Sequence, residues 1–256
     1  MSDGRWLEAA ELGARGHYAR AWRILDDLRV STPSMASLAS SMLGSHLRQI
    51  GAVEDARAVD ARALDEAHDA ESRADARIGL AADAIAAGDP ESAPAWLAAA
   101  EDDAMPHWRT RTRWHWVNAE TALALDRPVL PISAIDHALL AIDSCAGHSA
   151  RHLAKSRIIA DVARAAAGAV NVGDDLLAAA ETARAEQFAT LQWPLALVAG
   201  DLITSQAAAP DLVAAGPRLR IEGAAAVRTV AEGLPEPYRS AWLSGPAAAL
   251  LLSGGE

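Results

Sequence analysis

The sequence has few of the features that mark secreted, membrane-spanning or disulfide-linked proteins. Among its 256 residues there is one cysteine, Cys145, so no disulfide can form within the chain. The N-terminus has no basic segment followed by an apolar run, and Asp, Arg or Pro interrupts every apolar stretch before about 18 residues, the length of a spanning helix. We therefore expect a cytoplasmic protein that is neither secreted nor inserted in a membrane.

Positive charge is also scarce. Lys and Arg together number 23 against 34 Asp and Glu, which gives a net charge of −11, and Lys155 is the only lysine. Because a negative field repels phosphate backbones, we expect no nucleic-acid partner. The charge is uneven, since residues 50–104 carry 14 acidic residues against 4 Arg while 104–164 carry 8 basic residues against 5 acidic ones. Acidic and basic surfaces should be separated along the chain.

Strand-forming patterns are missing, because β-branched residues are scattered singly along the chain. The chain is instead rich in alanine, about a quarter of all residues, which has the highest helix propensity. Three segments repeat one pattern: a helical run, a glycine, an alanine five residues later, and a second helical run. Their glycines, Gly16, Gly51 and Gly88, are 35 and 37 residues apart, a period typical of stacked helical hairpins. The sequence predicts an all-α fold.

Glycine and proline positions predict about six antiparallel helix pairs in one domain spanning residues 1–256. Asp89 and Asp174 are expected to cap helices, with Pro90 as a first helical residue, and Pro246 should kink or split the last helix. The expected pairs are 3–15 with 17–29, 34–50 with 53–69, 72–87 with 90–103, 107–126 with 131–145 across the link 127–131, 149–167 with 174–187, and 192–206 with 217–232, followed by a helix at 236–252.

The first three repeats resemble tetratricopeptide repeats. The matching residues are Leu12, Gly13, Gly16, Tyr18, Ala21, Leu25, Leu28 and Pro33 in the first, Leu43, Gly44, Leu47, Gly51, Ala56 and Ala63 in the second, and Leu80, Ala81, Ala84, Gly88, Ala93, Leu97 and Ala100 in the third. Asp60 departs from the pattern, because the family places a large apolar residue there. The resemblance implies a tetratricopeptide-like solenoid, a right-handed α-α superhelix that binds a protein in a concave groove and has no chemistry of its own.

Residues 106–116, PHWRTRTRWHW, concentrate tryptophan, arginine and histidine. On a helix Arg109, Arg113 and Trp116 share one face, and Trp108 lies on a neighbouring face. Such a surface can bind an acidic peptide, a carboxylate or a phosphate, because arginine offers planar paired donors and tryptophan a stacking surface. In the alternative interpretation the tryptophans belong to the core and the arginines pair with the preceding acidic residues.

Two other groups of residues have weaker claims to a site. His148 and His152 have the spacing of a helical metal pair, with Cys145 and His137 nearby, but Gly147 separates the cysteine from their helix, so packing is the preferred interpretation. Two groups of carboxylates are expected to face solvent: Asp26 with Asp27, and Glu101 with Asp102 and Asp103. No catalytic or phosphate-binding motif is present, so we expect no enzyme, metal or cofactor.

These observations predict a non-catalytic module that binds a protein or peptide, in a regulatory or scaffold role. The first helix of each pair should line the groove. The expected contact residues are His46, Arg73, Arg77, Trp108, Arg109, Arg113 and Trp116. The alternative is a ligand-sensing regulator whose groove, lined by arginine and tryptophan, binds a small anionic ligand or a short peptide. The apolar C-terminal segment is expected to cap the last groove or to form a homodimer.

Overall fold

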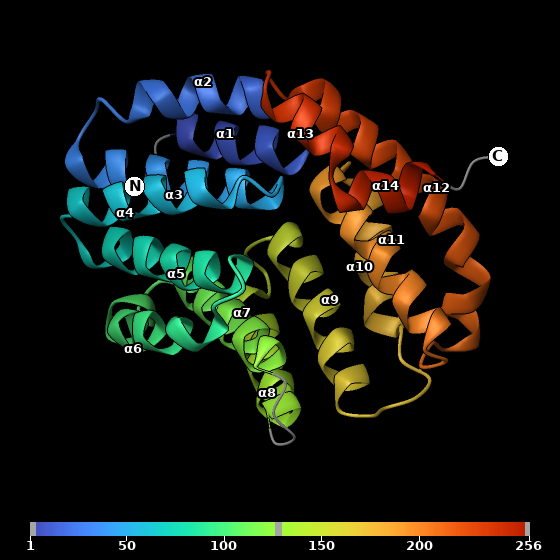
Figure 1. Ribbon diagram of the computed structural model, residues 1–256. Coiled ribbons are helices and arrows are strands. Elements are labelled where there is room, and N and C mark those ends of the chain that lie inside the picture. Colours follow the sequence, from blue (N-terminus) through green and yellow to red (C-terminus); the bar gives the residue numbers. More distant parts are fainter. Residues whose placement is uncertain (1–3, 126–129, 254–256) are drawn as a thin grey trace.

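Helices make up the regular structure of the protein in the computed structural model, which describes residues 4–125 and 130–253 (Figure 1). Within these ranges there are fourteen α-helices, one short 3₁₀ helix and no strand, and Val172 forms an isolated bridge with Ala208. The all-α prediction is confirmed. None of the helices in the described part has both the length and the apolar composition that crossing a membrane requires.

The helices follow one another with short connections. In chain order they are α1 (Gly4–Ala14), α2 (Tyr18–Leu28), α3 (Pro33–Gln49), α4 (Val53–Glu66), α5 (Ala70–Ala86), the 3₁₀ helix η1 (Pro90–Ser92), α6 (Ala93–Ala104), α7 (Trp108–Ala124), α8 (Leu130–Cys145), α9 (Ala150–Ala166), α10 (Asp174–Ala185), α11 (Ala189–Thr204), α12 (Pro210–Gly233), α13 (Tyr238–Ser244) and α14 (Pro246–Leu252).

Helices that are adjacent in sequence pack as adjacent pairs (Figure 1). The turns within the first three pairs are made at the predicted glycines, since Gly16, Gly51 and Gly88 have φ of 84°, 83° and 80°. A residue with a Cβ atom is strained at such angles, which explains the glycine at each turn. Alanines such as Ala21 and Ala56 are fully buried between helices, where a small side chain permits close packing.

Two predicted helix caps are wrong. Asp89 precedes the 3₁₀ turn η1 and its side chain makes no cap to the backbone; its carboxylate accepts a hydrogen bond from the Ser92 hydroxyl at 2.5 Å. Asp174 is the first residue inside α10, so it lies one position too late to cap that helix. The Leu176 amide instead donates to the carboxylate of Asp161, on α9, at 2.9 Å. A cap supplied by another helix leaves no local sequence pattern.

The C-terminal helices differ in part from the prediction. Helix α12 begins at Pro210 and includes Pro217, so the residues predicted to connect the sixth pair are partly helical. The last helix is split as expected, because Gly245 separates α13 from α14 and Pro246 is the first residue of α14. Helix α14 packs against α11 and α12, as a terminal cap does, while the predicted homodimer stays a prediction. The predicted link at 127–131 lies largely outside the described residues.

Helices of the N-terminal and C-terminal parts contact each other, α1 with α11 and α2 with α12, so the helix pairs are arranged in a ring (Figure 1). The Thr190 hydroxyl, on α11, donates to the carbonyl oxygen of Ala14 at 3.0 Å. The Tyr238 hydroxyl, in α13, donates to the carboxylate of Asp55 at 2.8 Å, and the Tyr238 ring meets the Trp22 ring edge-on at 5.2 Å. The chain therefore closes upon itself. The tetratricopeptide-like superhelix stays a prediction.

An apolar cluster seals this closure. It joins Tyr18 from α2 and Ile50, at the end of α3, to Val227 and Val230 of α12 and Trp242 of α13, all of them buried. Burial of apolar area contributes about 25 cal/mol per Å², so a cluster of this size is a substantial part of the stability of the fold. The N-terminal and C-terminal helices are thus held together mainly by apolar packing, and the hydrogen bonds of Thr190 and Tyr238 define their relative position.

The closure can be tested with two glycines of the C-terminal helices. A methyl group at Gly233 would overlap the backbone of Gly16, so Gly233→Ala should lower the free energy of unfolding by roughly 1–3 kcal/mol. Gly200, exposed on α11, has open space around it, so Gly200→Ala should raise the free energy of unfolding by about 1 kcal/mol through helix propensity alone. Urea denaturation measures both. Stabilisation of both variants would show that the chain ends do not meet at Gly233.

Candidate functional site

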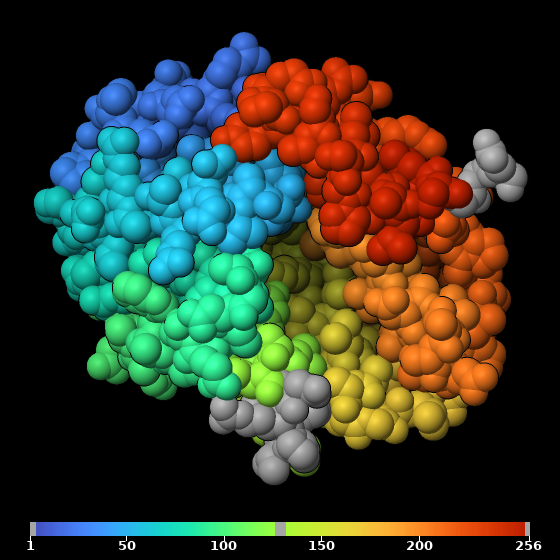
Figure 2. All heavy atoms as spheres, viewed as in Figure 1, coloured from blue at the N-terminus to red at the C-terminus, as the bar shows by residue number. Residues whose placement is uncertain are grey.

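A cavity of about 510 Å³ lies inside the ring of helices. Six helices line it, α1, α3, α5, α7, α9 and α11, which are the first helices of the six pairs. Figure 2 shows a hollow at this position, between the N-terminal and the C-terminal halves of the chain. The volume falls within the range of roughly 300–1,000 Å³ that is typical of sites for small organic molecules.

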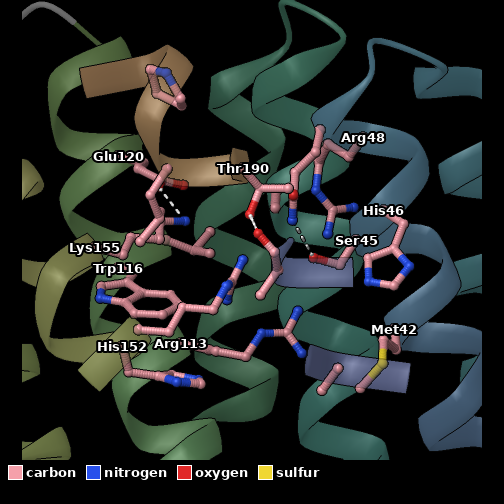
Figure 3. A pocket seen from close by; sticks show the side chains of 18 of the residues that line it. Met42, Ser45, His46, Arg48, Arg113, Trp116, Glu120, His152, Lys155 and Thr190 are labelled. Atoms are coloured by element: carbon pink, nitrogen blue, oxygen red, sulfur yellow. Dashed lines mark hydrogen bonds and ion pairs between the residues drawn. The ribbon is translucent and has the colours of Figure 1, made fainter. Parts of the chain in front are cut away.

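Much of the cavity wall is apolar. The apolar residues that line it are Trp6, Ala10, Ala14, Met42, Ala82, Ile85, Ala86, Trp116, Val117, Ile158, Ile159, Leu191, Trp193 and Pro194. Five cationic side chains also line it, Arg48, Arg109, Arg113, Arg151 and Lys155, whereas the lining carboxylates are Asp75 and Glu120. Figure 3 shows Lys155, Trp116 and His152 on one side of the pocket, with His46 and Arg48 on the other. The cavity is therefore apolar and cationic at once.

Two of these arginines share one buried carboxylate. Asp75, on α5, is 1% exposed and accepts from Arg109 Nη1 at 2.9 Å and from Arg113. Arg109 also pairs with Glu71 at 3.3 Å and lies over the Trp6 ring at 5.0 Å. Burial, with the nearby charge of Arg48, lowers the pKa of Arg113 to about 10, so its guanidinium remains charged at neutral pH.

The structure places the arginines and tryptophans of residues 106–116 as follows, and the binding of a ligand by them stays a prediction. The arginines do pair with acidic residues that precede them in sequence, and they line the cavity as well. Trp114 belongs to the core, where its indole donates to the carbonyl oxygen of Leu97 at 2.8 Å, whereas Trp116 lines the cavity.

A second buried group joins Arg48 to two carboxylates. Arg48 Nη1 contacts Asp60 at 3.0 Å and also Asp83. Glycines make room for Asp60, because a Cβ atom at Gly44 or Gly79 would lie 2.6 or 2.5 Å from its carboxylate. The ion pair of Asp60 thus links α4 to Arg48 in the cavity wall.

The two carboxyl groups around Arg48 favour a bound proton. Burial raises the pKa of Asp60 to about 7, and the charge of Asp83 adds to this effect, while Arg48 opposes it. The pKa of Asp83 is raised by burial as well. Each carboxylate has one buried oxygen, Asp60 Oδ1 and Asp83 Oδ2, without a hydrogen-bond partner in the described part of the chain. One guanidinium does not compensate two buried negative charges, so one of the carboxyls is readily protonated.

The histidines of the cavity are neutral at physiological pH. Burial lowers the pKa of His46 to about 3, and the charge of Arg151 acts in the same direction. Burial also lowers the pKa of His152 well below its ordinary value, with Arg151, Arg109, Arg113 and Lys155 adding to the effect. The His152 ring stacks on Trp116 at 5.0 Å. Positive charge in the cavity comes from the arginines and Lys155 alone.

Arg151 differs from the other cations of the cavity. Lys155 pairs with Glu120 at 3.0 Å and lies 4.5 Å from the centre of the Trp116 ring. Arg151 makes no hydrogen bond or ion pair with any residue that the structure describes, and its Nε is buried. Burial lowers its pKa. Arg151 is half-buried and no carboxylate in the described part of the chain compensates its charge, so it stands out among the lining residues.

The residues predicted to bind a partner lie in three places. His46, Arg109, Arg113 and Trp116 line the cavity. Trp108 lies behind this wall, where its ring stacks on His148 at 4.9 Å and meets His152 at 5.1 Å. Arg73 and Arg77 do not line the cavity; each pairs with Asp103 at 3.1 Å.

Sequence reasoning missed Arg48, Arg151 and Lys155. Two signals were available in the sequence, because Lys155 is the only lysine and Arg151 is adjacent to the histidine pair. That these three side chains line one cavity depends on the closed ring of helix pairs, and no local sequence pattern predicts this closure.

The other candidate groups take different places. His148 and His152 contact tryptophan rings, but only His152 lies on α9, because His148 is in the connection that turns at Gly147 (φ 74°), so the two do not form the predicted pair on one helix. The described residues contain no cluster of three or more metal-ligating side chains. Among the carboxylates Asp27 pairs with Arg5 at 2.6 Å, Asp26 with Arg29 at 3.3 Å and Asp103 with two arginines, while Glu101 and Asp102 are exposed.

Comparisons with protein-family models, with curated proteins and with solved structures found no match to this chain. Its function is therefore argued from the cavity and the residues around it.

The substitution Asp60→Asn tests the proton at Arg48. Because the folded pKa of about 7 exceeds the unfolded value of about 3.9, the folded wild type binds the extra proton between these pH values and loses stability as pH rises through them. Asparagine does not titrate, so the stability of the variant relative to wild type should increase from about pH 5 to about pH 8. Urea denaturation across this range measures it. A relative stability that stays constant across this range would mean that Arg48 instead keeps Asp60 ionised.

Proposed function

We propose that this protein is a non-catalytic binding protein that takes up a small organic anion in its central cavity. The observation that supports this most directly is the combination of a largely apolar wall with five cationic side chains that line the same cavity. An apolar wall favours uptake of an apolar body, and guanidinium groups bind carboxylates or phosphates through paired, charge-assisted hydrogen bonds. We infer a regulatory role in which binding of the ligand is sensed by the ring of helices.

The low polarity of the cavity strengthens such binding. Charge–charge attraction grows as the effective dielectric constant falls, so an anion is held more tightly here than on an exposed surface with the same arginines. Most of the cations are already oriented by carboxylates on neighbouring helices, such as Asp75 for Arg109 and Arg113. A ligand therefore meets donors whose side-chain entropy is already lost, which favours affinity.

The closure of the ring favours a small ligand over a folded protein partner. In an open array the inner helices offer a continuous groove, whereas here α1 contacts α11 and α2 contacts α12. Two of the residues predicted to bind a partner, Arg73 and Arg77, are engaged with Asp103 outside the cavity. Binding of a protein partner by a tetratricopeptide-like superhelix remains a proposal. If the partner is a short peptide, the cavity would accommodate one end of it.

The contacts of the cavity histidines support binding rather than proton transfer. The His152 ring stacks on Trp116 and meets Trp108 edge-on, and its Nδ1 lies 2.9 Å from the Ser149 hydroxyl. The pKa of His46 is lowered to about 3, so it is a poor base at neutral pH.

A thermal-shift panel tests the proposal. Carboxylates, phosphates, amines and alcohols on matched aromatic and aliphatic bodies are added to the wild type. An anion present at about a hundred times its dissociation constant contributes about 2.7 kcal/mol, which should raise the melting temperature by roughly 5–10 °C. The amines should give no shift, since the cavity is cationic.

Two matched alanine substitutions locate the binding site. Ala10 lines the cavity from α1, so Ala10→Phe should fill part of it and abolish the shift. Ala98 is exposed on α6, so Ala98→Phe should leave the shift unchanged. A shift that survives in Ala10→Phe, or the absence of any shift across the panel, would contradict uptake of a small anion by the cavity.

A further inference from the structure

The charges around the cavity nearly balance, with one exception. Four of the five lining cations have a carboxylate within ion-pair distance: Arg48 with Asp60 and Asp83, Arg109 with Asp75 and Glu71, Arg113 with Asp75, and Lys155 with Glu120. Arg151 is the lining cation that has none within the described ranges. Arg151 is therefore the lining cation whose positive charge lacks a carboxylate partner among the described residues.

The charge of Arg151 is felt by residues of the N-terminal helices. Arg151 lies on α9, and its charge acts on both Tyr18 of α2 and His46 of α3. The Tyr18 hydroxyl is already used, because it donates to the side chain of Gln49 at 2.9 Å. No acidic side chain among the residues of known placement takes up the guanidinium of Arg151.

His46 presents a second unsatisfied polar atom to the same region. The residue is 5% exposed, lines the cavity, and its Nδ1 has no hydrogen-bond partner in the part of the chain that the structure describes. Gly13 allows its ring to approach α1, since a Cβ atom there would overlap the imidazole. His46 is therefore a second polar group of the cavity wall whose hydrogen bonds are incomplete within the described residues.

Apolar side chains surround this polar pair on the C-terminal side of the cavity. Ile158 and Ile159 lie on α9 with Arg151, and Leu191 and Trp193 lie on the adjacent α11. A ligand that fills the rest of the cavity must therefore carry an apolar body next to the anionic group that contacts Arg151. A bare inorganic ion would leave that wall without contacts.

We infer that the ligand is an organic monoanion, a single carboxylate on an apolar body, and that Arg151 holds its carboxylate. This inference rests on the proposed function of the cavity. One guanidinium without a partner requires one negative charge, whereas a second charge on the ligand would have to displace Asp75, Glu120 or the Arg48 carboxylates from cations they already bind. Bidentate contact with guanidinium suits a carboxylate.

Four naphthalene probes that share one skeleton test the charge of the ligand. They are 2-naphthoate, 2-naphthylmethanol, 2-naphthylmethylamine and naphthalene-2,6-dicarboxylate, titrated into the wild-type protein by calorimetry. The naphthoate should bind about tenfold more tightly than the alcohol, as expected for a charge-assisted hydrogen bond to a buried arginine. The amine should bind more weakly than the alcohol, and the dicarboxylate no more tightly than the naphthoate.

Substitution of Arg151 then assigns the effect to this residue. In Arg151→Met the ratio of naphthoate to alcohol affinity should fall to about one, while the affinity for the alcohol is retained. The melting temperature of ligand-free Arg151→Met should be higher than that of the wild type, because a half-buried charge without a carboxylate partner has been replaced by an apolar side chain of similar length. Arg228→Met, at an exposed arginine of α12, should change neither the ratio nor the affinities.

The outcomes separate the two proposals. Equal binding of naphthoate and alcohol, both abolished by Ala10→Phe, would leave the cavity as a binding site and overturn the role of Arg151. Tighter binding of the dicarboxylate would overturn the monoanion. A lower melting temperature in Arg151→Met with an unchanged affinity ratio would show that Arg151 has only a structural role. Binding of none of the four probes would overturn the cavity proposal together with this inference.

Discussion

The structure depends on pairing between cations and carboxylates that lie on different helices around the cavity. Burying a guanidinium costs free energy unless a carboxylate compensates its charge. Each paired arginine therefore also positions the neighbouring helix that carries its carboxylate. Arg48 of α3 binds carboxylates of α4 and α5, and Arg113 of α7 binds one of α5. These pairs keep a cationic wall inside a protein whose net charge is −11. They also identify Arg151 by contrast, since it lacks such a partner among the described residues.

Small residues make this arrangement possible. Gly44 and Gly79 leave the space that the Asp60 carboxylate fills, and Gly13 leaves the space for the His46 ring. Alanines at the helix crossings bring the backbones close enough for short polar side chains to reach the next helix. In a core built from larger side chains the carboxylates would be held apart from the arginines. The many small residues of the chain thus allow polar contacts between helices, in addition to the contribution of alanine to helix formation.

Much of the fold could be predicted from the sequence, because helix propensity and turn glycines act locally. Gly16, Gly51 and Gly88 have the positive φ that their position between helical runs indicates, and Pro246 does begin a new helix. The caps at Asp89 and Asp174 failed, since a 3₁₀ turn and a carboxylate from α9 replace them. The site was predicted in part. His46, Arg109, Arg113 and Trp116 were found from the first helices of their pairs, whereas Arg73 and Arg77 were assigned to the cavity face wrongly.

The helices, their order and the packing of each against the next helix follow from interactions between residues close in the chain, so they could be predicted. The contact between the two ends, the cavity between the inner helices and the compensation of its cations appear only once the chain is folded. The reason is physical: closure depends on contacts such as Thr190 with Ala14, 176 residues apart, and the cost of a buried charge depends on whatever the fold places beside it.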